Sequence, residues 1–590
     1  MKTLKKIYSL RQSFSVIGLT GRTGAGVSRV AHFLSQNFSD IKDIQGEKKV
    51  KELTDIQRKY NMSYNFSATN WKKYKVIEYK DILLLHLIRC DINKIKLLLD
   101  SYETFKNDSD RLIQILVKNN DLLSKINNIG KIDKNLKSKK KLKTLSKIFF
   151  KEREFKILSD EFNNNLKKLS IKDRISFFNL IANNLRKSGD CINGADDLGT
   201  HIYTIVESIN KLIKVQRNKT PENTHIVIDS LRNSLEIMYF KERYSAFYMF
   251  SINSEHRRSF LMKKYNDDKK IVDDILNIDI IEYEGKGVSK GEFYIQDVQN
   301  CIQLSDVHFN YNPSFEFKNK DYSDKEKLKE ACDYYIIGQI IRYTSLILHP
   351  GLITPSAQER CMQIAYNAKS NSGCISRQVG AVVADRDFSI KAIGWNDVPS
   401  NVTPCIYRNV NSLKLKEDVD AYTPYELDES HSYNSSFKKY YKDINENYID
   451  GLSCSFCFKD FQNLYEKKDN QVHTRSLHAE ENAMLQISKY GGQSLKNGIL
   501  FTTASPCELC SKKARQLEIT QIYYIDPYPG ISEKHILQGG KIYPELILFV
   551  GAVGSAYHKL YNPIMSHKDE LALITGLRPK QDFKNNFTLD

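Results

Sequence analysis

The chain is poor in the residues that break regular structure: its 590 residues include only 27 glycines and 13 prolines. This scarcity excludes a collagen-like chain and argues against long flexible linkers. Eleven cysteines are too few for a small disulfide scaffold. No apolar run approaches the roughly 18 residues that a membrane-spanning helix needs. These absences leave a globular chain, and the 41% hydrophobic and 27% charged residues are typical of that class.

The N-terminus is basic and then apolar, as in a secretory signal peptide. Its apolar run, Phe14–Leu19, is short, is interrupted by Ser15, and leads into a glycine-rich loop instead of a cleavage site. We therefore expect a cytoplasmic protein with no membrane partner. Two cysteine pairs have C-x-x-C spacing, which in a reducing compartment indicates metal binding more often than a disulfide.

The formal net charge of +17 is unevenly distributed along the chain. Residues 351–590 hold 27 Lys+Arg and 27 Asp+Glu, so the excess lies entirely in residues 1–350. The segment Lys131–Lys156 alone holds 11 basic and 3 acidic residues. This asymmetry predicts two functional halves. The N-terminal half has the positive charge expected of a segment that binds nucleic acid.

A glycine-rich loop follows the buried-strand pattern of Phe14–Leu19 and precedes a helical pattern, which is the context of a phosphate-binding loop. The loop fits the G-x-x-x-x-G-K-[ST] template except that Val27 replaces the lysine that contacts phosphates. We therefore predict nucleotide binding without efficient phosphoryl transfer, with Arg22 or Arg29 as the alternative source of charge. The predicted binding positions are Gly21, Gly24, Gly26 and Ser28.

Three later segments extend this pattern. His225–Asp229 is a short apolar strand that ends in Asp229, the form of a strand that holds Mg²⁺. Strand patterns recur at 246–252 and 306–310. Together they resemble a nucleoside-monophosphate-kinase-like P-loop domain, which we assign to residues 1–320; the alternative is an α/β domain with an incidental glycine turn.

Residues 81–215 have helical periodicity and predict a helical insertion in this domain. The basic segment Lys131–Lys156 lies inside it, either as a solvated helical face or as a surface that contacts RNA. Residues 321–354 predict a helical connector, and residues 355–590 a second domain.

The second domain carries the clearest chemical pattern, His478-Ala479-Glu480 followed 29 residues later by Pro506-Cys507-Glu508-Leu509-Cys510. This is the H-x-E…P-C-x-x-C signature of zinc deaminases. Helical patterns beginning after His478 and at Cys507, with a strand at 499–503 between them, place His478 and Cys507 at two helix N-termini. There a thiolate is favoured, and three ligands leave the fourth position of zinc for water.

Glu480 is two residues from His478 and is predicted to be the catalytic acid and base. It would move a proton from that water to the ring nitrogen of the base and then to the leaving ammonia. We therefore predict one catalytic Zn²⁺ held by His478, Cys507 and Cys510.

Residues 355–560 also resemble the cytidine/deoxycytidylate deaminase family, which has an α/β/α fold. The resemblance rests on Cys374–Val382, on Gly394–Pro399, which is similar to the family's G-[YW]-N-x-x-P, and on Thr503–Ser505 before Pro506. It implies that Arg377 contacts the substrate phosphate and that Asn396 holds the sugar and base. It also implies that Ser505 lines the pocket and that Tyr528 closes over the nucleotide.

A degenerate P-loop domain fused to this deaminase resembles the bacterial anti-phage dCTP/dCMP deaminases. Ser372–Arg377 and the tail Gly551–Tyr561 are similar to theirs. The resemblance implies deamination of free dCTP and dCMP, depletion of the nucleotide pool during infection, and restraint by a partner such as a small RNA. Deaminases of this type are often homo-oligomers, so we expect self-association.

The segment between Asn396 and His478 is longer than a minimal deaminase needs, and it contains four further metal-ligand side chains. They predict either a second, structural zinc or an ordinary insertion with buried thiols. These residues are Cys405, Cys454, Cys457 and His473.

The leading hypothesis is an α/β enzyme that deaminates free deoxycytidine nucleotides with zinc. One alternative is a cytosine or adenosine deaminase acting on nucleic acid, for which the basic half would hold the polymer. The neutral charge of residues 351–590 argues against it, because phosphates supply most of the affinity for a polymer. A regulatory or RNA-binding protein with an inactive deaminase fold is the third reading.

Overall fold

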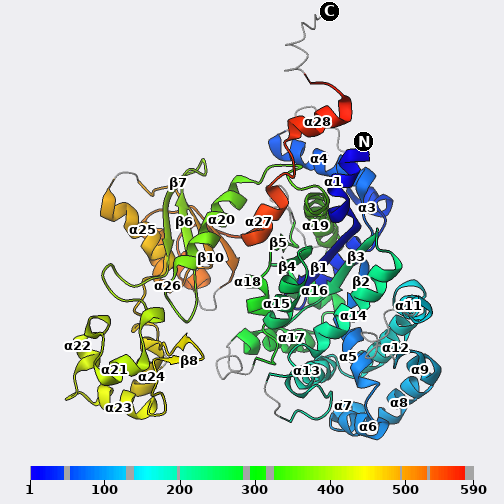
Figure 1. The fold of residues 1–590 in the computed structure, drawn as a ribbon, viewed down its shortest axis with the longest axis horizontal. Coiled ribbons are helices and arrows are strands. Elements are labelled where there is room, and N and C mark those ends of the chain that lie inside the picture. The colour runs from blue at the N-terminus through cyan, green and yellow to red at the C-terminus, as the bar shows by residue number, and fades with distance from the viewer. Residues whose placement is uncertain are drawn as a thin grey trace, which may run out of the picture. The chain divides into compact units, whose positions relative to one another are not determined.

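The computed structural model describes residues 2–45, 54–127, 139–195, 199–283, 293–313, 325–468, 470–491, 494–527 and 532–578. The chain folds as two compact units (Figure 1). The first comprises Met1–Thr354 with Ser555–Asp590, and the second comprises Pro355–Gly554. Each unit contains a β-sheet with helices packed against it. Within the described ranges, no helix is long and apolar enough to cross a membrane.

A parallel sheet forms the centre of the first unit, with strands in the order β5-β4-β1-β3-β2. Residues of β1, β3 and β4 are buried throughout, as expected for parallel strands covered on both faces. Strands at these three places and at β5 agree with the sequence prediction. The short β2 was missed because its two charged ends obscure the apolar pattern. The strands are β1 (Phe14–Thr20), β2 (Lys75–Glu78), β3 (Thr224–Asp229), β4 (Phe247–Asn253) and β5 (Val307–Asn310).

The described part of residues 81–215 is helical and contains no strand, as its periodicity predicted, and its limits as an insertion stay a prediction. The basic segment within it is amphipathic, because Leu142, Leu145 and Ile148 are buried in the core of this unit. Residues 131–138 of that segment lie outside the described residues. The helices are α5 (Tyr79–Leu87), α6 (Ile92–Asp100), α7 (Glu103–Lys106), α8 (Ser109–Val117), α9 (Asn120–Ile126), α11 (Lys139–Ser146), η2 (Lys147–Lys151), α12 (Glu154–Leu169), α13 (Ile171–Ser188) and α14 (Thr204–Lys219).

The segment predicted as a connector forms α19 (Lys325–Leu348), which packs on α4 (Asp55–Asn70) inside the first unit. The C-terminal α28 (His567–Thr575) also lies in the first unit, although we assigned residues 355–590 together to the second domain. There Glu570 accepts a hydrogen bond from Tyr8 at 3.4 Å, and its carboxylate lies 2.6 Å from His349 Nε2. Contacts between residues this far apart in sequence leave no local pattern from which to predict them.

The other helices of the first unit surround its sheet or join its strands. They are α1 (Lys2–Ser13), α2 (Val27–Leu34), α3 (Phe38–Gln45), α15 (Ser234–Arg243), α16 (Arg257–Lys264), α17 (Lys269–Tyr283), α18 (Val298–Gln303) and α27 (Gly554–Tyr561).

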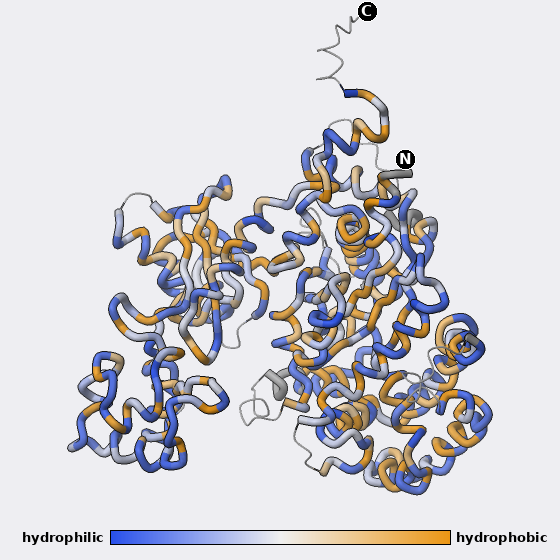
Figure 2. Tube along the Cα trace, viewed as in Figure 1, coloured by the Kyte–Doolittle hydropathy of each residue, from blue (hydrophilic) through white to orange (hydrophobic). Residues whose placement is uncertain are grey.

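A five-stranded mixed sheet, in the order β12-β11-β10-β6-β7, forms the centre of the second unit. Strands β10, β11 and β12 are parallel, and β6 and β7 are antiparallel to their neighbours. The strands are β6 (Gly380–Ala384), β7 (Ile390–Trp395), β10 (Ile499–Ala504), β11 (Gln521–Asp526) and β12 (Glu545–Leu548). Figure 2 shows that the strands of both sheets are largely hydrophobic.

Two glycines show that helices cover both faces of this second sheet. A Cβ on Gly380 would lie 2.0 Å from the carbonyl oxygen of Ala365 in α20 (Ala357–Ala368). A Cβ on Gly394 would lie 2.3 Å from the backbone nitrogen of Ala483 in α25 (Ala479–Tyr490). Gly394 pairs with Ala381, which points opposite to Gly380, so α20 and α25 cover opposite faces. This is the predicted α/β/α layering.

An insertion between β7 and α25, residues 398–476, has its own aromatic core. Tyr433, Phe437, Phe456 and Phe461 pack together in it. Its elements are η6 (Cys405–Tyr407), α21 (Val410–Leu415), η7 (Val419–Ala421), α22 (Pro424–Leu427), α23 (Ser432–Tyr440), β8 (Tyr448–Ile449), β9 (Leu452–Ser453) and α24 (Phe458–Glu466). The remaining elements of the unit are η5 (Lys369–Asn371), α26 (Glu508–Gln516), η8 (Ser532–Leu537) and β13 (Gly551–Ala552).

Candidate active site

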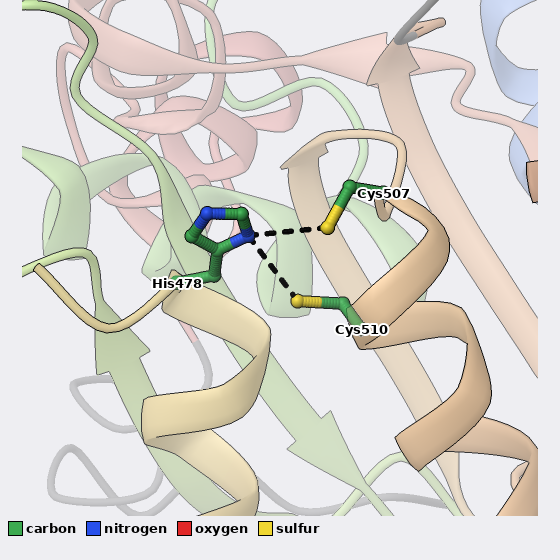
Figure 3. A group of neighbouring side chains, drawn as sticks. All are labelled: His478, Cys507 and Cys510. Atoms are coloured by element: carbon green, nitrogen blue, oxygen red, sulfur yellow. Dashed lines mark hydrogen bonds between the residues drawn. The ribbon is translucent and has the colours of Figure 1, made fainter. Parts of the chain in front are cut away.

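Two helix N-termini bring His478, Cys507 and Cys510 together in the second unit (Figure 3). His478 is the N-cap of α25, Cys507 is the N-cap of α26, and Cys510 lies one turn into α26. His478 Nδ1 lies 3.3 Å from the Sγ of Cys507 and 3.4 Å from the Sγ of Cys510. Over the described residues, this is the one group of three or more His, Cys, Asp and Glu side chains with its ligand atoms within 4.8 Å of one another.

The electrostatics of this group favour a bound cation. Hydrogen bonds from Cys510 and then from His478 stabilise the Cys507 thiolate and lower the pKa of Cys507 to about 4. The positive end of the α26 dipole acts in the same direction. One imidazole nitrogen and two sulfurs are the donors that Zn²⁺ prefers, and they are unlike the oxygen ligands of Mg²⁺ or Ca²⁺. The residues present therefore fit zinc, with one tetrahedral position left open.

Glu480 lies in the first turn of α25 and is 4% exposed. Its Oε1 accepts a hydrogen bond of 2.9 Å from Thr502 Oγ1 on β10, which orients the carboxylate. Burial raises the pKa of Glu480, because it penalises the charged form. A general acid and base works best when its pKa lies close to the working pH, and burial shifts the pKa of Glu480 in that direction.

A cavity of about 260 Å³ opens on Glu480 and His478. Arg377, Asn396 and Ser505, which we predicted as substrate contacts, also line it. The fourth predicted contact, Tyr528, lies outside the described residues.

Two of these side chains form hydrogen bonds or ion pairs with other residues of the same unit. Arg377 donates to the fully buried Asp526 at 3.0 Å. The amide of Asn396 accepts from Val379 N at 2.6 Å and donates to Arg377 O at 2.7 Å. Both residues therefore hold the loop before β6 in shape. Sequence reasoning missed Asp526 and Thr502 because each acts through a partner distant in the chain.

The four side chains predicted to bind a second zinc are not assembled in this structure. Cys405 and Cys457 line the cavity, together with Cys374, a thiol that we had not considered as a ligand. His473 Nε2 instead lies 3.3 Å from Glu466 Oε1. Among the described residues, no group of three or more neighbouring metal-ligand side chains includes Cys454. The second zinc stays a prediction.

In the first unit, the glycine-rich loop joins β1 to α2. Gly24 and Gly26 have φ of 86° and 96°, and a Cβ on Gly26 would lie 2.7 Å from the Tyr311 ring, so this position requires glycine. Ser28 hydrogen-bonds Asp229 at the end of β3, and burial raises the pKa of Asp229. The loop serine and the strand aspartate are thus adjacent, as a nucleotide site with Mg²⁺ would need.

Two residues at this loop bear on the predicted phosphate site. Val27, in place of the template lysine, is buried. Arg29 forms two hydrogen bonds with Asp333, at 2.6 and 3.0 Å, so its charge is directed away from the loop.

Comparison with known proteins places the second unit in a described class. Residues 355–526 match the family model of the cytidine and deoxycytidylate deaminase zinc-binding region. The C-terminal region therefore contains a deaminase domain of this kind.

Individual relatives match about a third of the chain. The deoxycytidylate deaminase of Enterobacteria phage T4 is 25% identical over 168 residues, 28% of this chain and 76% of that protein. The deoxycytidylate deaminase of Schizosaccharomyces pombe is 26% identical over 182 residues, 31% of this chain and 41% of that protein. A solved structure of the dCMP deaminase from cyanophage S-TIM5, in complex with dCMP and dUMP, is 24% identical in sequence. The match covers 33% of this chain and 99% of that one, with a TM-score of 0.21.

Proposed function

We propose that the protein is a zinc-dependent hydrolase that deaminates free deoxycytidine nucleotides, dCMP and dCTP, to dUMP and dUTP. The observation that carries this proposal is the grouping of His478, Cys507 and Cys510 at a cavity that His478, Cys507 and the buried Glu480 line. The names of the relatives, all deoxycytidylate deaminases, support the substrate class.

The proposed mechanism divides the work between the metal and Glu480. When bound, zinc supplies a Lewis acid that makes water a nucleophile at neutral pH. Glu480 takes a proton from the water whose oxygen adds to C4 of cytosine, and delivers it to N3. A second proton passes through the same carboxylate to the departing amine, which leaves as ammonia. Thr502 holds the carboxylate in place during both transfers.

Charge favours a free nucleotide over a polymer as the substrate. Residues 351–590 are formally neutral, and both arginines that line the cavity, Arg377 and Arg475, lie within 4.0 Å of a buried carboxylate. A polymer would need a basic track beside the pocket, because phosphates supply most of its affinity.

The direct test is to incubate purified protein with dCTP, dCMP, CTP and single-stranded DNA and to follow uracil products by mass. We expect conversion of dCMP and dCTP. Conversion of DNA alone would favour the nucleic-acid deaminase, and no conversion by zinc-loaded protein would contradict an active enzyme.

The biological role that we propose is depletion of the deoxycytidine nucleotide pool during phage infection. It rests on the sequence resemblance to anti-phage deaminases. Cellular dCTP, measured by mass spectrometry after infection, should fall in cells with the intact protein and hold in cells with Glu480→Gln.

For the first unit, we propose nucleotide binding at Gly21–Ser28 without phosphoryl transfer. The adjacency of Ser28 and Asp229 supports it, and the buried Val27 argues against catalysis. Titration calorimetry with ATP and Mg²⁺ should detect binding that Ser28→Ala weakens. Equal affinity of both proteins would contradict a role for the loop serine.

A further inference from the structure

The insertion of residues 398–476 supplies one wall of the catalytic cavity. Phe458, Lys459, Gln471 and Arg475 of the insertion line the same cavity as Glu480. All these residues belong to the unit Pro355–Gly554. The pocket is therefore completed by a segment outside the layered sheet.

Besides His478, three basic side chains line this cavity, and two of them face buried carboxylates. Arg377 pairs with Asp526, which is 0% exposed. Arg475 lies 4.0 Å from Glu426, which is also 0% exposed, and donates to Thr403 O at 3.3 Å. Because a buried carboxylate is poorly screened by water, Asp526 largely neutralises Arg377. Glu426 is already ion-paired with Arg408, so it compensates the charge of Arg475 only in part.

Lys459 differs from both arginines. Its Nζ donates to the neutral amide oxygen of Gln471 at 3.3 Å. Its acidic neighbour, Asp460, lies 3.6 Å away with 64% of its side chain exposed, whereas the Lys459 side chain is 19% exposed. Water screens such an exposed pair strongly. Among the described residues, this exposed carboxylate is the one acidic partner of Lys459, so much of the lysine's charge stays available to a substrate.

The backbone beside Lys459 adds to this charge. Lys459 is the second residue of α24, whose N-cap is Cys457. Sulfur is a weak acceptor, so Cys457 competes poorly for the first N–H groups of the helix. Ser376 Oγ lies 3.7 Å from Cys457 Sγ, which places the start of α24 next to the loop before β6.

We propose that Lys459, with the amide of Gln471, forms the subsite for the phosphate groups of the deoxycytidine nucleotide. This inference rests on the proposed function and assigns the recognition of phosphate to the insertion. A lysine ammonium acts as a point charge, so it suits phosphates whose number varies between substrates. Affinity should therefore depend on Lys459 more strongly for dCTP than for dCMP, and not at all for deoxycytidine.

The test measures binding separately from turnover. Titration calorimetry in a Glu480→Gln background compares Lys459→Gln, Lys459→Arg and the matched control Lys468→Gln. Lys468 lies on the same insertion, is 65% exposed and pairs with Glu466. We expect Lys459→Gln to weaken dCTP binding by roughly 10- to 100-fold and dCMP binding by less. Lys459→Arg should retain most of the affinity, and Lys468→Gln should bind like the parent.

Two results would overturn the subsite: unchanged dCTP affinity in Lys459→Gln, or an equal loss for deoxycytidine and dCTP. The second would indicate a general structural effect, which circular dichroism melting would show independently. Failure of the proposed function is a separate result, namely that zinc-loaded wild-type protein forms no uracil nucleotide.

Discussion

Glu480 is the residue whose surroundings most directly define its chemical task. It is buried, it is oriented by Thr502, and it lies two positions from a predicted zinc ligand. A carboxylate in this setting moves protons and does not need to bind the metal. The distinction between those two roles can be measured.

Glu480→Gln should lower kcat for dCMP by about 10³-fold or more, because proton transfer contributes roughly 10²- to 10⁴-fold. Zinc content, measured by mass spectrometry, should stay unchanged. Glu481→Gln, at the adjacent position where the side chain pairs with Lys513, serves as the control and should retain activity. Loss of zinc in Glu480→Gln would show that the carboxylate has a ligand role instead.

Asp81 is a partly buried carboxyl, located where α5 meets α12. It accepts a hydrogen bond of 2.6 Å from Ser159, and burial raises the pKa of Asp81 to about 7. Because this pKa is above the unfolded value, the folded state favours the neutral form. The free energy of unfolding therefore falls as pH rises from about 4 through 7, and levels off above.

Asp81→Asn should remove this fall, since asparagine does not titrate and can still accept from Ser159. Above pH 7 we expect the variant to be more stable than wild type by up to about 4 kcal/mol, and at pH 4 to match it. Urea unfolding across this pH range measures the effect. Asp121→Asn, at an exposed position of α9, should leave the wild-type slope; identical slopes for Asp81→Asn and wild type would refute the argument.

At the scale of elements, the insertion of the second unit depends on a buried ion pair. Arg408 and Glu426 are both 0% exposed and form an ion pair. Arg408 also donates to Ala421 O at 3.1 Å. Glu426 caps α22 by accepting from Thr423 N at 3.0 Å. This pair links the loop after η6 to α22 and so stabilises the wall that carries Lys459.

Arg408→Met should destabilise the protein by about 3–5 kcal/mol, because it leaves the Glu426 charge buried with only the more distant Arg475 opposite it. Arg408→Met with Glu426→Gln should recover most of that loss, since glutamine is neutral and can still cap the helix. Chemical unfolding of wild type, both single variants and the double variant gives the coupling energy. Additive effects of the two substitutions would exclude the proposed dependence.

At the scale of the whole molecule, the excess positive charge belongs to the first unit and the deaminase site to the second. The basic segment Lys131–Lys156 cannot be removed cleanly, because Leu142, Leu145 and Ile148 on it are core residues. Substitution of its exposed lysines tests its role without breaking that core.

Lys140→Gln, Lys141→Gln and Lys143→Gln together should leave dCMP deamination within about twofold of wild type. If this face binds a small RNA, the slope of log affinity against log salt should become shallower by up to about 2, from roughly 0.7 per phosphate contact. Filter binding at several salt concentrations measures the slope. An unchanged slope would assign these lysines to a solvated face, and lost deamination would contradict independence of the two units.

Much of the fold was predictable because its signals are local. Apolar runs indicated β1, β3, β4 and β5, and helical periodicity indicated the insertion of residues 81–215. Long-range packing was not predictable in the same way. The C-terminal helix α28 joins the first unit through Glu570, and Arg377 pairs with Asp526 across 149 positions of the chain. Neither contact has a sequence period or a fixed spacing.

The sequence by itself determined the spacing of the proposed metal ligands, because C-x-x-C places two sulfurs on one helix face and H-x-E places the proposed acid two residues from the histidine. Only the tertiary structure decided which basic residue keeps an uncompensated positive charge that could bind a substrate. Arg377, Arg475 and Lys459 are all cations in the sequence, but the charge that each can offer depends on how buried the carboxylate opposite it is and on whether that carboxylate is already paired. Burial is a property of the folded chain, since it is set by residues that meet only in three dimensions.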